Sequence, residues 1–316
     1  MKAFGFAAEG ASAGFIEIPT PDPGPGEIRV RVRASSVNGY DVYVATGMAR
    51  GSTEHRYPVV VGKDYAGVVE ALGEGVTRLA EGDEVVGIVP PEPHLQRGAY
   101  AETVVVPAEG FIERKPGNVG FEEAGSIGLA GLTALVAVDV IDPARDELVL
   151  ISGAAGGVGG FAVQMAAARG AHVIATGLPE DMDRLSALGA SETVDYSSDE
   201  AAAVREKHPE GIDGLIVAVP LGDAFASVAG LVKDGGRIAT ATGSSGEEAL
   251  EERGVSILSV FWGGDPSGFE RLVRLVAEGS VSVPVTEIFG FEEIPQALGL
   301  VGKRHSRGKF AITIGG

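Results

Sequence analysis

The glycine-rich segment between Leu148 and Gly160 has the residue types and spacing to bind a phosphate. It reads Leu-Val-Leu-Ile-Ser-Gly-Ala-Ala-Gly-Gly-Val-Gly-Gly. The apolar run Leu148–Ile151 predicts a buried strand, and the Ala-rich segment Phe161–Arg169 predicts a helix. A helix N-terminus presents free backbone N–H groups and the positive end of its dipole to the turn that precedes it. The order strand, turn, helix therefore predicts an anion site at this turn.

The small residues of this turn follow the dinucleotide-binding pattern Gly-x-Gly-x-x-Gly, with Ala154 in the first place and Gly156 and Gly159 in the others. The first residue makes the tight turn, the second lets a pyrophosphate approach the backbone, and the third lets helix and strand pack closely. In a chain with 48 glycines such a run is also compatible with a flexible loop. The flanking strand and helix favour dinucleotide binding, and the expected contacts at the turn are Ala154, Ala155, Gly156, Gly157 and Val158.

The end of the next strand bears on which dinucleotide is bound. Folds that prefer NAD place Asp or Glu there, about 20 residues after the glycine motif, to bond the ribose hydroxyls. Here Thr176 and Gly177 occupy that place, and the first acid is Glu180. Because a carboxylate would repel a 2′-phosphate, its absence favours NADPH over NADH. Arg184 would either supply a positive charge to that phosphate or pair with Asp181 or Glu180 on its own helix.

The composition excludes several classes of protein. The 316 residues suffice for two domains, and 45% hydrophobic residues are typical of a globular protein. A net charge of −19 argues against nucleic acid or an anionic membrane as a partner. The absence of Cys excludes disulfides, Cys-ligated zinc, Fe–S clusters and thiol catalysis. There is no signal-peptide pattern and no apolar run near the ~20 residues that span a bilayer, so we expect a cytoplasmic protein.

The first 121 residues carry the signals of strands and turns. Residues 27–34 alternate charged and apolar side chains, as a half-buried strand does, and they follow a Pro/Gly-rich loop. Further strands are expected at 65–72, 84–89 and 100–106. Short strands without intervening helices predict a barrel-like β domain.

The second half alternates apolar strands with helical stretches, which predicts a doubly wound parallel sheet. Strands are expected at 172–176, 193–195, 214–219, 237–241 and 256–261, and helices at 179–188, 199–207 and 224–231. A helix at 268–278 and strands near 285–289 and 309–314 resemble the first domain, and we expect the tail to return there. We therefore expect an α/β protein with a catalytic domain of residues 1–121 and 265–316 and a dinucleotide-binding domain of residues 122–264.

A set of motifs spans nearly the full length of the chain. They are Ala-Ser-Ser-Val-Asn-Gly-Tyr-Asp at 34–41, Gly-Lys-Asp-Tyr-Ala-Gly-Val-Val at 62–69, Ala-Tyr-Ala-Glu at 99–102, Gly-Leu-Ala-Gly-Leu-Thr-Ala at 128–134, the glycine turn at 153–159, Gly-Gly-Arg at 235–237 and Arg-Gly-Lys at 307–309. In type and order they resemble the zinc-independent quinone oxidoreductase branch of the medium-chain dehydrogenase/reductase superfamily. The resemblance implies a GroES-like β domain and a Rossmann domain, with the active site in the cleft between them.

The resemblance also bears on metal binding. Zinc alcohol dehydrogenases of this superfamily hold the catalytic zinc with Cys, His and Cys from three separate segments. Asn38, Lys63 and Leu129 stand in these places, and the four Cys of a structural zinc lobe are missing. The five His residues lack zinc-ligand spacing. We therefore expect a protein that does not use zinc, in which Lys63 is either an exposed charge or an electrostatic substitute at the metal position.

Without a metal, the substrate must accept hydride readily. Quinones and α,β-unsaturated carbonyls do so, because the negative charge spreads onto a carbonyl oxygen that the protein can stabilise. The family implies that Asn38 and Thr133 lie by the nicotinamide, although each is also compatible with a structural role. Tyr40 is the best-placed donor to the substrate oxygen, or else an aromatic wall of its pocket. Asp41 and Asp64 are expected to be structural, as a helix cap and a cleft hydrogen bond.

The same resemblance assigns further residues to the cofactor. Tyr196, after the third strand, is expected against the adenosine phosphate or on the surface, and Lys309 is expected to reach the cofactor. The segment with Trp262 borders the nicotinamide and a dimer interface in this family. The predicted cofactor contacts are Asn38, Thr133, Ala154, Ala155, Gly156, Gly157, Val158, Thr176, Gly177, Arg184, Tyr196, Val219, Phe261, Trp262 and Lys309.

Three functions remain open. The first is an NADPH-dependent reductase for a small quinone or an enone. The second is an enoyl-thioester reductase of the same fold, whose phosphopantetheine-bearing partner would need a basic entrance that this acidic chain gives little sign of. The third is a sensor or structural protein that binds NADPH without turnover. A homodimer is implied by the family alone.

Overall fold

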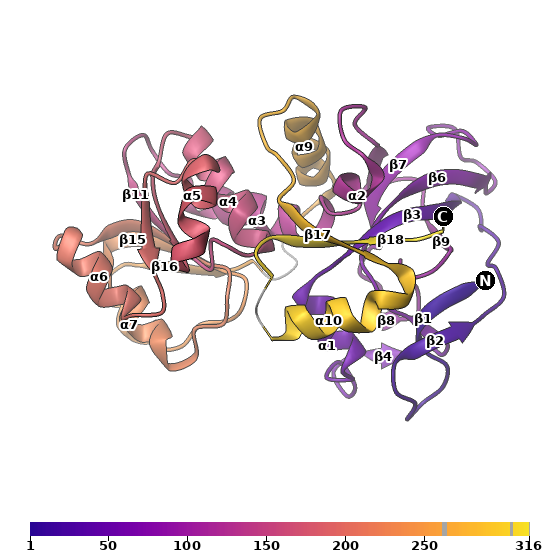
Figure 1. The fold of residues 1–316 in the computed structure, drawn as a ribbon, viewed down its shortest axis with the longest axis horizontal. Helices are drawn as coiled ribbons and strands as arrows, with labels where there is room; N and C mark the ends of the chain where they lie inside the picture. Colours follow the sequence, from indigo (N-terminus) through magenta and orange to yellow (C-terminus); the bar gives the residue numbers. More distant parts are fainter. Residues whose placement is uncertain (261–263, 304–305, 316) are drawn as a thin grey trace. The chain divides into compact units, whose positions relative to one another are not determined.

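The computed structural model describes residues 1–260, 264–303 and 306–315, and the chain divides into two compact units (Figure 1). Unit 1 comprises Met1–Leu129, Asp265–Gly279 and Val283–Gly316. Unit 2 comprises Ala130–Gly264 and Ser280–Ser282. The division after Leu129 falls inside a helix, α3, whereas the expected domain boundary lay after residue 121.

Unit 1 is built mainly of strands. Its largest sheet has the order β10-β7-β6-β3-β18-β17, and β9 pairs with the first part of β3. The strands are β1 Lys2–Phe6, β2 Gly14–Glu17, β3 Glu27–Val37, β4 Glu54–His55, β5 Val59–Val60, β6 Asp64–Leu72, β7 Glu84–Ile88, β8 His94–Leu95, β9 Thr103–Pro107, β10 Ile112–Arg114, β17 Val285–Gly290 and β18 Lys309–Thr313. The helices are α1 Gly39–Ala45, α2 Phe121–Ala124, α9 Pro266–Ala277 and α10 Ile294–Gly302, with a 3-10 turn at Phe291–Glu293.

Strand β3 is the centre of this sheet, and its sequence explains its place. Ile28, Val30 and Val32 are buried while the arginines between them face outward, which is the alternation of a strand with one face on the core. From Ala34 to Val37 the alternation stops and every residue is buried. This second part of β3 leads directly into the polar cluster described below.

The C-terminal strand β18 lies between β3 and β17. It runs antiparallel to β3 and parallel to β17, and in Figure 1 the yellow end of the chain lies alongside the indigo strand. Ala311 and Ile312 are fully buried there. The chain therefore returns to unit 1 after forming unit 2.

Unit 2 is a doubly wound parallel sheet, and the predicted α/β fold class is confirmed. The strand order is β13-β12-β11-β14-β15-β16, with every neighbouring pair parallel. Its elements are α3 Gly128–Ile141, β11 Leu148–Ser152, α4 Gly157–Ala168, β12 His172–Gly177, a 3-10 turn Pro179–Asp181, α5 Met182–Ala187, β13 Glu192–Asp195, α6 Glu200–Lys207, β14 Ile212–Val217, a 3-10 turn Gly222–Ala224, α7 Phe225–Ala229, β15 Val232–Thr240, α8 Glu247–Glu251 and β16 Ser256–Ser259. The strand order reverses between β11 and β14, where such folds bind nucleotides.

Some element limits differ from the sequence-based expectation. β15 begins at Val232 rather than at 237, because the Lys-Asp-Gly-Gly segment continues the strand through a register shift instead of forming a turn. Helix α1 interrupts the expected run of strands in unit 1. Within the described parts of the chain, no helix has the length and apolar character needed to cross a membrane.

Replacing Ile312 by Ala tests the position of β18. Ile312 is fully buried, so we expect the free energy of unfolding to fall by about 2–5 kcal/mol. Ile288, on the neighbouring strand β17, is 57% exposed, and Ile288→Ala should change it by no more than ~0.5 kcal/mol. Urea unfolding followed by circular dichroism measures both. Equal losses would contradict the burial of β18.

Candidate active site

The turn after β11 has the backbone geometry that a dinucleotide phosphate requires. Gly153 has a φ of +81°, which favours glycine, and a Cβ there would lie 2.9 Å from the Cβ of Val219. A Cβ on Gly159 would lie 2.2 Å from the Gly153 carbonyl oxygen, so only glycine lets α4 pack this closely on the turn. We expected the tight turn at Ala154, but the positive φ is at Gly153, and Ala154 is fully buried.

Helix α4 begins directly after this turn. Gly156 is its N-cap and Gly157 its first residue. The N–H groups of the first turn, including that of Val158, have no acceptor within the helix. A Cβ on Gly156 would come no closer than 3.4 Å to another protein atom, so this side of the backbone is open to a ligand. The residues present therefore fit a pyrophosphate at the N-terminus of α4.

The carboxyl ends of four parallel strands bring the predicted cofactor residues of unit 2 together. The Thr176 hydroxyl, at the end of β12, accepts the Gly153 N–H at 3.0 Å and so holds the glycine turn. The Tyr196 N–H, after β13, donates to the Gly177 carbonyl at 3.3 Å. Val219, after β14, packs against Gly153. These contacts join the ends of β11, β12, β13 and β14 into one site.

The Arg184 guanidinium makes two contacts at this edge. Nη2 donates to the Ala155 carbonyl of the glycine turn at 2.8 Å and lies 3.7 Å from Asp181 Oδ1. The pairing with Asp181 is therefore present, and the other alternative, a positive charge for a 2′-phosphate, stays a prediction. The guanidinium lies near the end of β12, where the buried Asp181 carboxylate also accepts the Leu178 N–H at 3.1 Å.

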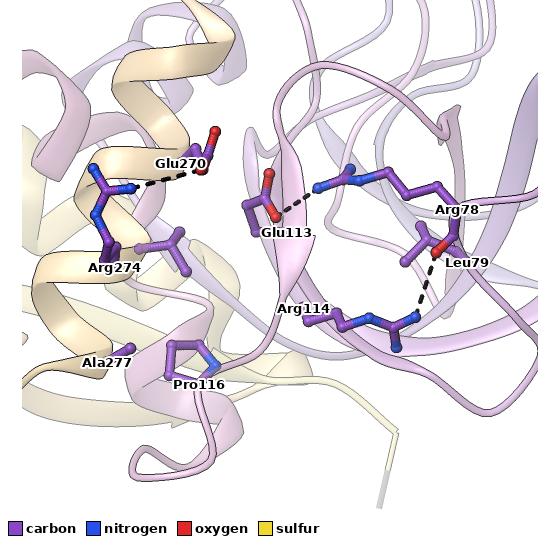
Figure 2. A pocket seen from close by; sticks show the side chains of 9 residues that line it. Arg78, Leu79, Glu113, Arg114, Pro116, Glu270, Arg274 and Ala277 are labelled. Carbon is purple, nitrogen blue, oxygen red and sulfur yellow. Dashed lines mark hydrogen bonds and ion pairs between the residues drawn. The ribbon is translucent and has the colours of Figure 1, made fainter.

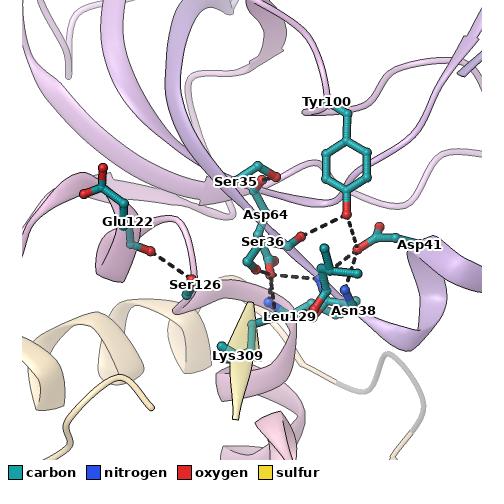
Figure 3. Close-up of polar contacts among 11 residues, drawn as sticks. Ser35, Ser36, Asn38, Asp41, Asp64, Tyr100, Glu122, Ser126, Leu129 and Lys309 are labelled. Carbon is teal, nitrogen blue, oxygen red and sulfur yellow. Dashed lines mark hydrogen bonds and ion pairs between the residues drawn. The ribbon is translucent and has the colours of Figure 1, made fainter. Parts of the chain in front are cut away.

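In unit 1, a buried polar cluster forms around Asp64, the first residue of β6 (Figure 3). Asp64 Oδ1 accepts the Leu129 N–H at 2.7 Å. Asp64 Oδ2 accepts the Ser36 hydroxyl at 2.7 Å and the Asn38 amide at 2.9 Å, and lies 3.5 Å from the Lys309 ammonium. One carboxylate thus joins β3, β6, β18 and the start of α3.

The side-chain amide of Asn38 is fully oriented by this cluster. Nδ2 donates to Asp41 at 3.1 Å and to Asp64 at 2.9 Å, and Oδ1 accepts from Lys309 at 2.6 Å. The backbone N–H of Asn38 also donates to Asp41, which caps α1 as expected. Both amide hydrogens are used, so Asn38 in this arrangement has acceptor capacity only.

The cluster holds charges that burial has shifted. Burial and the nearby charge of Asp64 raise the pKa of Asp41 to about 7, although the Asn38 hydrogen bonds and Lys309 oppose the shift. Burial lowers the pKa of Lys309, and Asp64 opposes that shift. The Tyr100 hydroxyl donates to the Ser36 carbonyl at 3.2 Å and to Asp41 at 3.4 Å, and burial raises its pKa.

Known proteins match both units. Residues 24–116 match the alcohol dehydrogenase GroES-like domain, and residues 157–278 match the zinc-binding dehydrogenase domain. A chloroplast envelope quinone oxidoreductase homolog of Arabidopsis thaliana is 32% identical, over 66% of this chain and 64% of that protein. A solved NAD-dependent alcohol dehydrogenase has a TM-score of 0.88 and 32% identity, with 100% of both chains covered. This chain belongs to the medium-chain dehydrogenase/reductase superfamily.

Quinone oxidoreductases among the relatives confirm the resemblance to that branch of the superfamily. The solved quinone oxidoreductase of Coxiella burnetii has a TM-score of 0.88 and 28% identity, with 100% of this chain and 99% of that chain covered. The chain is thus an oxidoreductase of the medium-chain type, with a GroES-like unit, a Rossmann unit and a nicotinamide cofactor.

The three residues at the positions of the superfamily's zinc ligands, Asn38, Lys63 and Leu129, all adjoin Asp64. The side chains there do not fit the metal, because Leu129 offers no donor atom, Lys63 offers an ammonium, and the Asn38 oxygen is bound to Lys309. Among the described residues, no group of three or more His, Asp or Glu side chains is placed to hold a metal ion. Independence from zinc stays a prediction.

Lys63 is not the exposed charge that one interpretation allowed. Its side chain is buried, and its ammonium lies 3.3 Å and 3.4 Å from the carbonyl oxygens of Val89 and Pro90 and 5.6 Å from the ring centroid of Tyr40. Burial lowers the pKa of Lys63, and the charge of Asp41 opposes this. The other interpretation, an electrostatic substitute at the metal position, remains.

The remaining predicted site residues differ in their burial and contacts. Tyr40 is partly buried beside Lys63, and burial together with Asp41 raises the pKa of its phenol. Thr133 lies in α3 and is half-buried. Lys309 is only 2% exposed, with its ammonium bound inside unit 1, so its contact with the cofactor stays a prediction. Phe261 and Trp262 lie outside the described residues.

A separate cavity in unit 1 contains none of the predicted site residues (Figure 2). It has a volume of about 450 Å³ and is lined by Arg78, Leu79, Glu113, Arg114, Pro116, Glu270, Val273, Arg274 and Ala277. Each of its arginines is paired with a carboxylate, those of Glu113, Asp83 and Glu270. The positive charges of this cavity are therefore paired with carboxylates of the protein, and the cavity does not form a binding site for an anionic ligand.

Replacing Asp41 by Asn tests the charge state of the cluster. The pKa of Asp41 rises from 3.8 to about 7 on folding, so the folded protein binds a proton that the unfolded chain releases between these pH values. The contribution of Asp41 to stability is therefore present below pH 4 and is lost as the pH rises towards 7. In urea unfolding at a series of pH values, Asp41→Asn should lose less stability than wild type over this window.

Asp223→Asn, a change at an exposed position in unit 2, is the matched control and should keep the wild-type dependence. Parallel curves for wild type and Asp41→Asn would show that Asp41 ionises normally in the folded protein.

Proposed function

We propose that the protein is an NADPH-dependent reductase that transfers a hydride to a small quinone or α,β-unsaturated carbonyl, without zinc. The observation that carries the proposal is the phosphate turn at α4 with Arg184 beside it and Thr176-Gly177 in place of an acid. The quinone oxidoreductase names among its relatives support the substrate class.

Binding of the dinucleotide divides between backbone and side chain. The N–H groups of Gly157 and Val158 would hold the pyrophosphate, and Thr176 would hold the turn in shape. Arg184 would bind the 2′-phosphate, since a guanidinium carries five N–H donors and can bond Ala155 and a phosphate oxygen together. Strand β12 itself ends at Thr176-Gly177 without an acid, and the nearby Asp181 carboxylate is buried, accepts the Leu178 N–H at 3.1 Å and lies 3.7 Å from Arg184.

The residues of unit 1 would act on the substrate. When bound, NADPH supplies the hydride, and the substrate then takes a proton from water or from a hydroxyl donor such as Tyr40. The buried ammonium of Lys63 would stabilise the negative charge that develops on the substrate oxygen, because burial strengthens such an interaction. The Tyr40 ring would form a wall for a planar substrate, and Asn38 would accept a hydrogen bond.

The same proposal includes the setting of the enzyme. We propose a cytoplasmic homodimer formed through β16, the edge strand of the unit 2 sheet, where Leu258 is 52% exposed. With a net charge of −19, neither nucleic acid nor an anionic membrane surface is proposed as a partner.

Oxidation of NADPH, followed by its absorbance, tests the activity. The substrates are 1,4-benzoquinone, 9,10-phenanthrenequinone, 2-cyclohexenone and crotonyl-CoA, each with and without a zinc chelator. We expect turnover with the quinones or the enone, unchanged by the chelator. Turnover with crotonyl-CoA alone would replace this function by enoyl-thioester reduction. NADPH binding without oxidation of any substrate would replace it by a sensor or structural role.

Replacing Arg184 by Met tests the preference for NADPH. Loss of one charged hydrogen bond, about 1.5–3 kcal/mol, should raise the Kd for NADPH about 10- to 100-fold and leave that for NADH within about threefold. Titration of the bound nicotinamide fluorescence measures both constants. Arg205→Met, on the exposed side of α6, is the control and should change neither. Equal weakening of both cofactors would refute the assignment of Arg184 to the 2′-phosphate.

A further inference from the structure

Lys309 is a buried cation for which the proposed mechanism has no step. It lies at the start of β18 with 2% of its surface exposed. Its ammonium donates to Asn38 Oδ1 at 2.6 Å and to the Val37 carbonyl at 3.1 Å, and lies 3.5 Å from Asp64 Oδ2 (Figure 3). All three contacts are with residues at the end of β3 or the start of β6.

The contact with Asn38 determines which way the amide points. With Lys309 in place, the carbonyl oxygen faces a cation and the amino group faces the carboxylates of Asp41 and Asp64. The reversed amide would set its N–H donors against the ammonium and its oxygen against two carboxylates. Charged hydrogen bonds of this kind are the strong ones, so Lys309 selects a single orientation.

The contact with Asp64 extends this effect to helix α3. The other oxygen of Asp64 accepts the N–H of Leu129, one turn before Thr133 in α3. A Cβ on Gly128 would lie 2.3 Å from this oxygen, so the carboxylate lies directly against the first turn of the helix. Lys309 therefore acts on the start of α3 through Asp64 and on Asn38 directly.

Stability alone does not account for such a cluster. Two carboxylates and an ammonium lose their hydration on burial, and apolar side chains of similar volume often give a fold of equal or greater stability. A cluster of this kind is better explained by the geometry that it imposes. Here the cluster orients Asn38 directly and contacts Leu129, one turn before Thr133 in α3, and Asn38 and Thr133 are the two residues predicted to lie by the nicotinamide.

We propose that Lys309 is a positioning residue of the hydride-transfer site, which holds the Asn38 amide directly and the start of α3 through Asp64. The proposal rests on the function proposed above to the extent that Asn38 and Thr133 border the reacting atoms. It differs from the expectation that Lys309 binds the cofactor itself.

Lys309→Met is the first test, with kcat, KM and the NADPH Kd measured separately. We expect kcat to fall about 10- to 100-fold, as for loss of a residue that orients a catalytic group, while the Kd stays within about threefold. In the double variant with Asn38→Ala, the two losses should not add, because Lys309 acts through Asn38. A Kd raised tenfold or more, or fully additive losses, would overturn the proposal. Lys2→Met, 61% exposed in the same unit, is the matched control and should leave all three constants unchanged.

Two further variants separate positioning from folding. Lys309→Gln keeps an N–H donor for Asn38 and should recover part of the lost kcat. Lys309→Met with Asp64→Asn removes a cation and an anion together, and should fold more stably than Lys309→Met while kcat stays low. Recovery of kcat in that pair would show that only charge balance matters, and failure of all three variants to fold would assign Lys309 to folding alone. Either result overturns the proposal.

Hydrogen–deuterium exchange keeps this test apart from that of the proposed function. Without any substrate, Lys309→Met should speed exchange at the backbone N–H groups of Asn38 and Leu129, and Lys2→Met should not. If the wild-type protein fails to oxidise NADPH with any of the substrates, the proposed function is wrong. The exchange measurement still reports on the contacts of Lys309 in that case. Unchanged exchange at both groups would overturn the positioning role whatever the activity.

Discussion

The carboxylate of Asp64 is the constraint on which the polar interior of unit 1 depends. A buried carboxylate is costly unless donors replace its lost water, and here the donors come from Ser36, Asn38, Leu129 and Lys309. Ser36 and Asn38 lie at or just after the end of β3, Leu129 in α3 and Lys309 in β18, so with Asp64 in β6 the contacts join four elements. Moving any one of those elements would leave a charge unsatisfied inside the protein, so the cluster fixes their relative positions within unit 1.

In unit 2 the phosphate turn depends on residues without side chains. Its phosphate turn depends on Gly153 for a positive φ and on Gly159 for close packing of α4, and Gly156 leaves the backbone open. The charge that attracts an anion comes from the helix N-terminus and from Arg184. One unit thus offers a preformed cluster of polar side chains, and the other offers exposed backbone with a single guanidinium.

Local patterns in the sequence were enough to predict most of the strands and helices of the fold. The alternation at 27–34 identified β3, and the apolar strands after residue 148 identified the parallel sheet, because hydrophobic period and turn residues are local properties. The start of β15 was missed, since Lys-Asp-Gly-Gly looks like a turn and only pairing with β14 makes it a strand. Thr176, Arg184 and Val219 were predicted as cofactor contacts; in the structure they contact the phosphate turn, and their contact with the cofactor stays a prediction.

The contacts of the polar cluster could not be predicted in this way. Lys309 and Asn38 are separated by 271 positions, and nothing in either motif says that one orients the other. The burial of Lys63 could not be predicted either, because a lysine between Gly62 and Asp64 suggests an exposed side chain. Contacts of this kind depend on how strands pair across the whole chain.

The position of β18 has a consequence for how the protein is made. Unit 2 is encoded almost without interruption between residues 130 and 264, so it can fold while the last strand of unit 1 is still being translated. Until Lys309 emerges from the ribosome, Asp64 lacks the ammonium that lies 3.5 Å from it, and the edge of β3 at 34–37 lacks its partner strand β18. The first part of unit 1 therefore completes its sheet only after β18 has been synthesised. Until then the edge of β3 is open and available to chaperones.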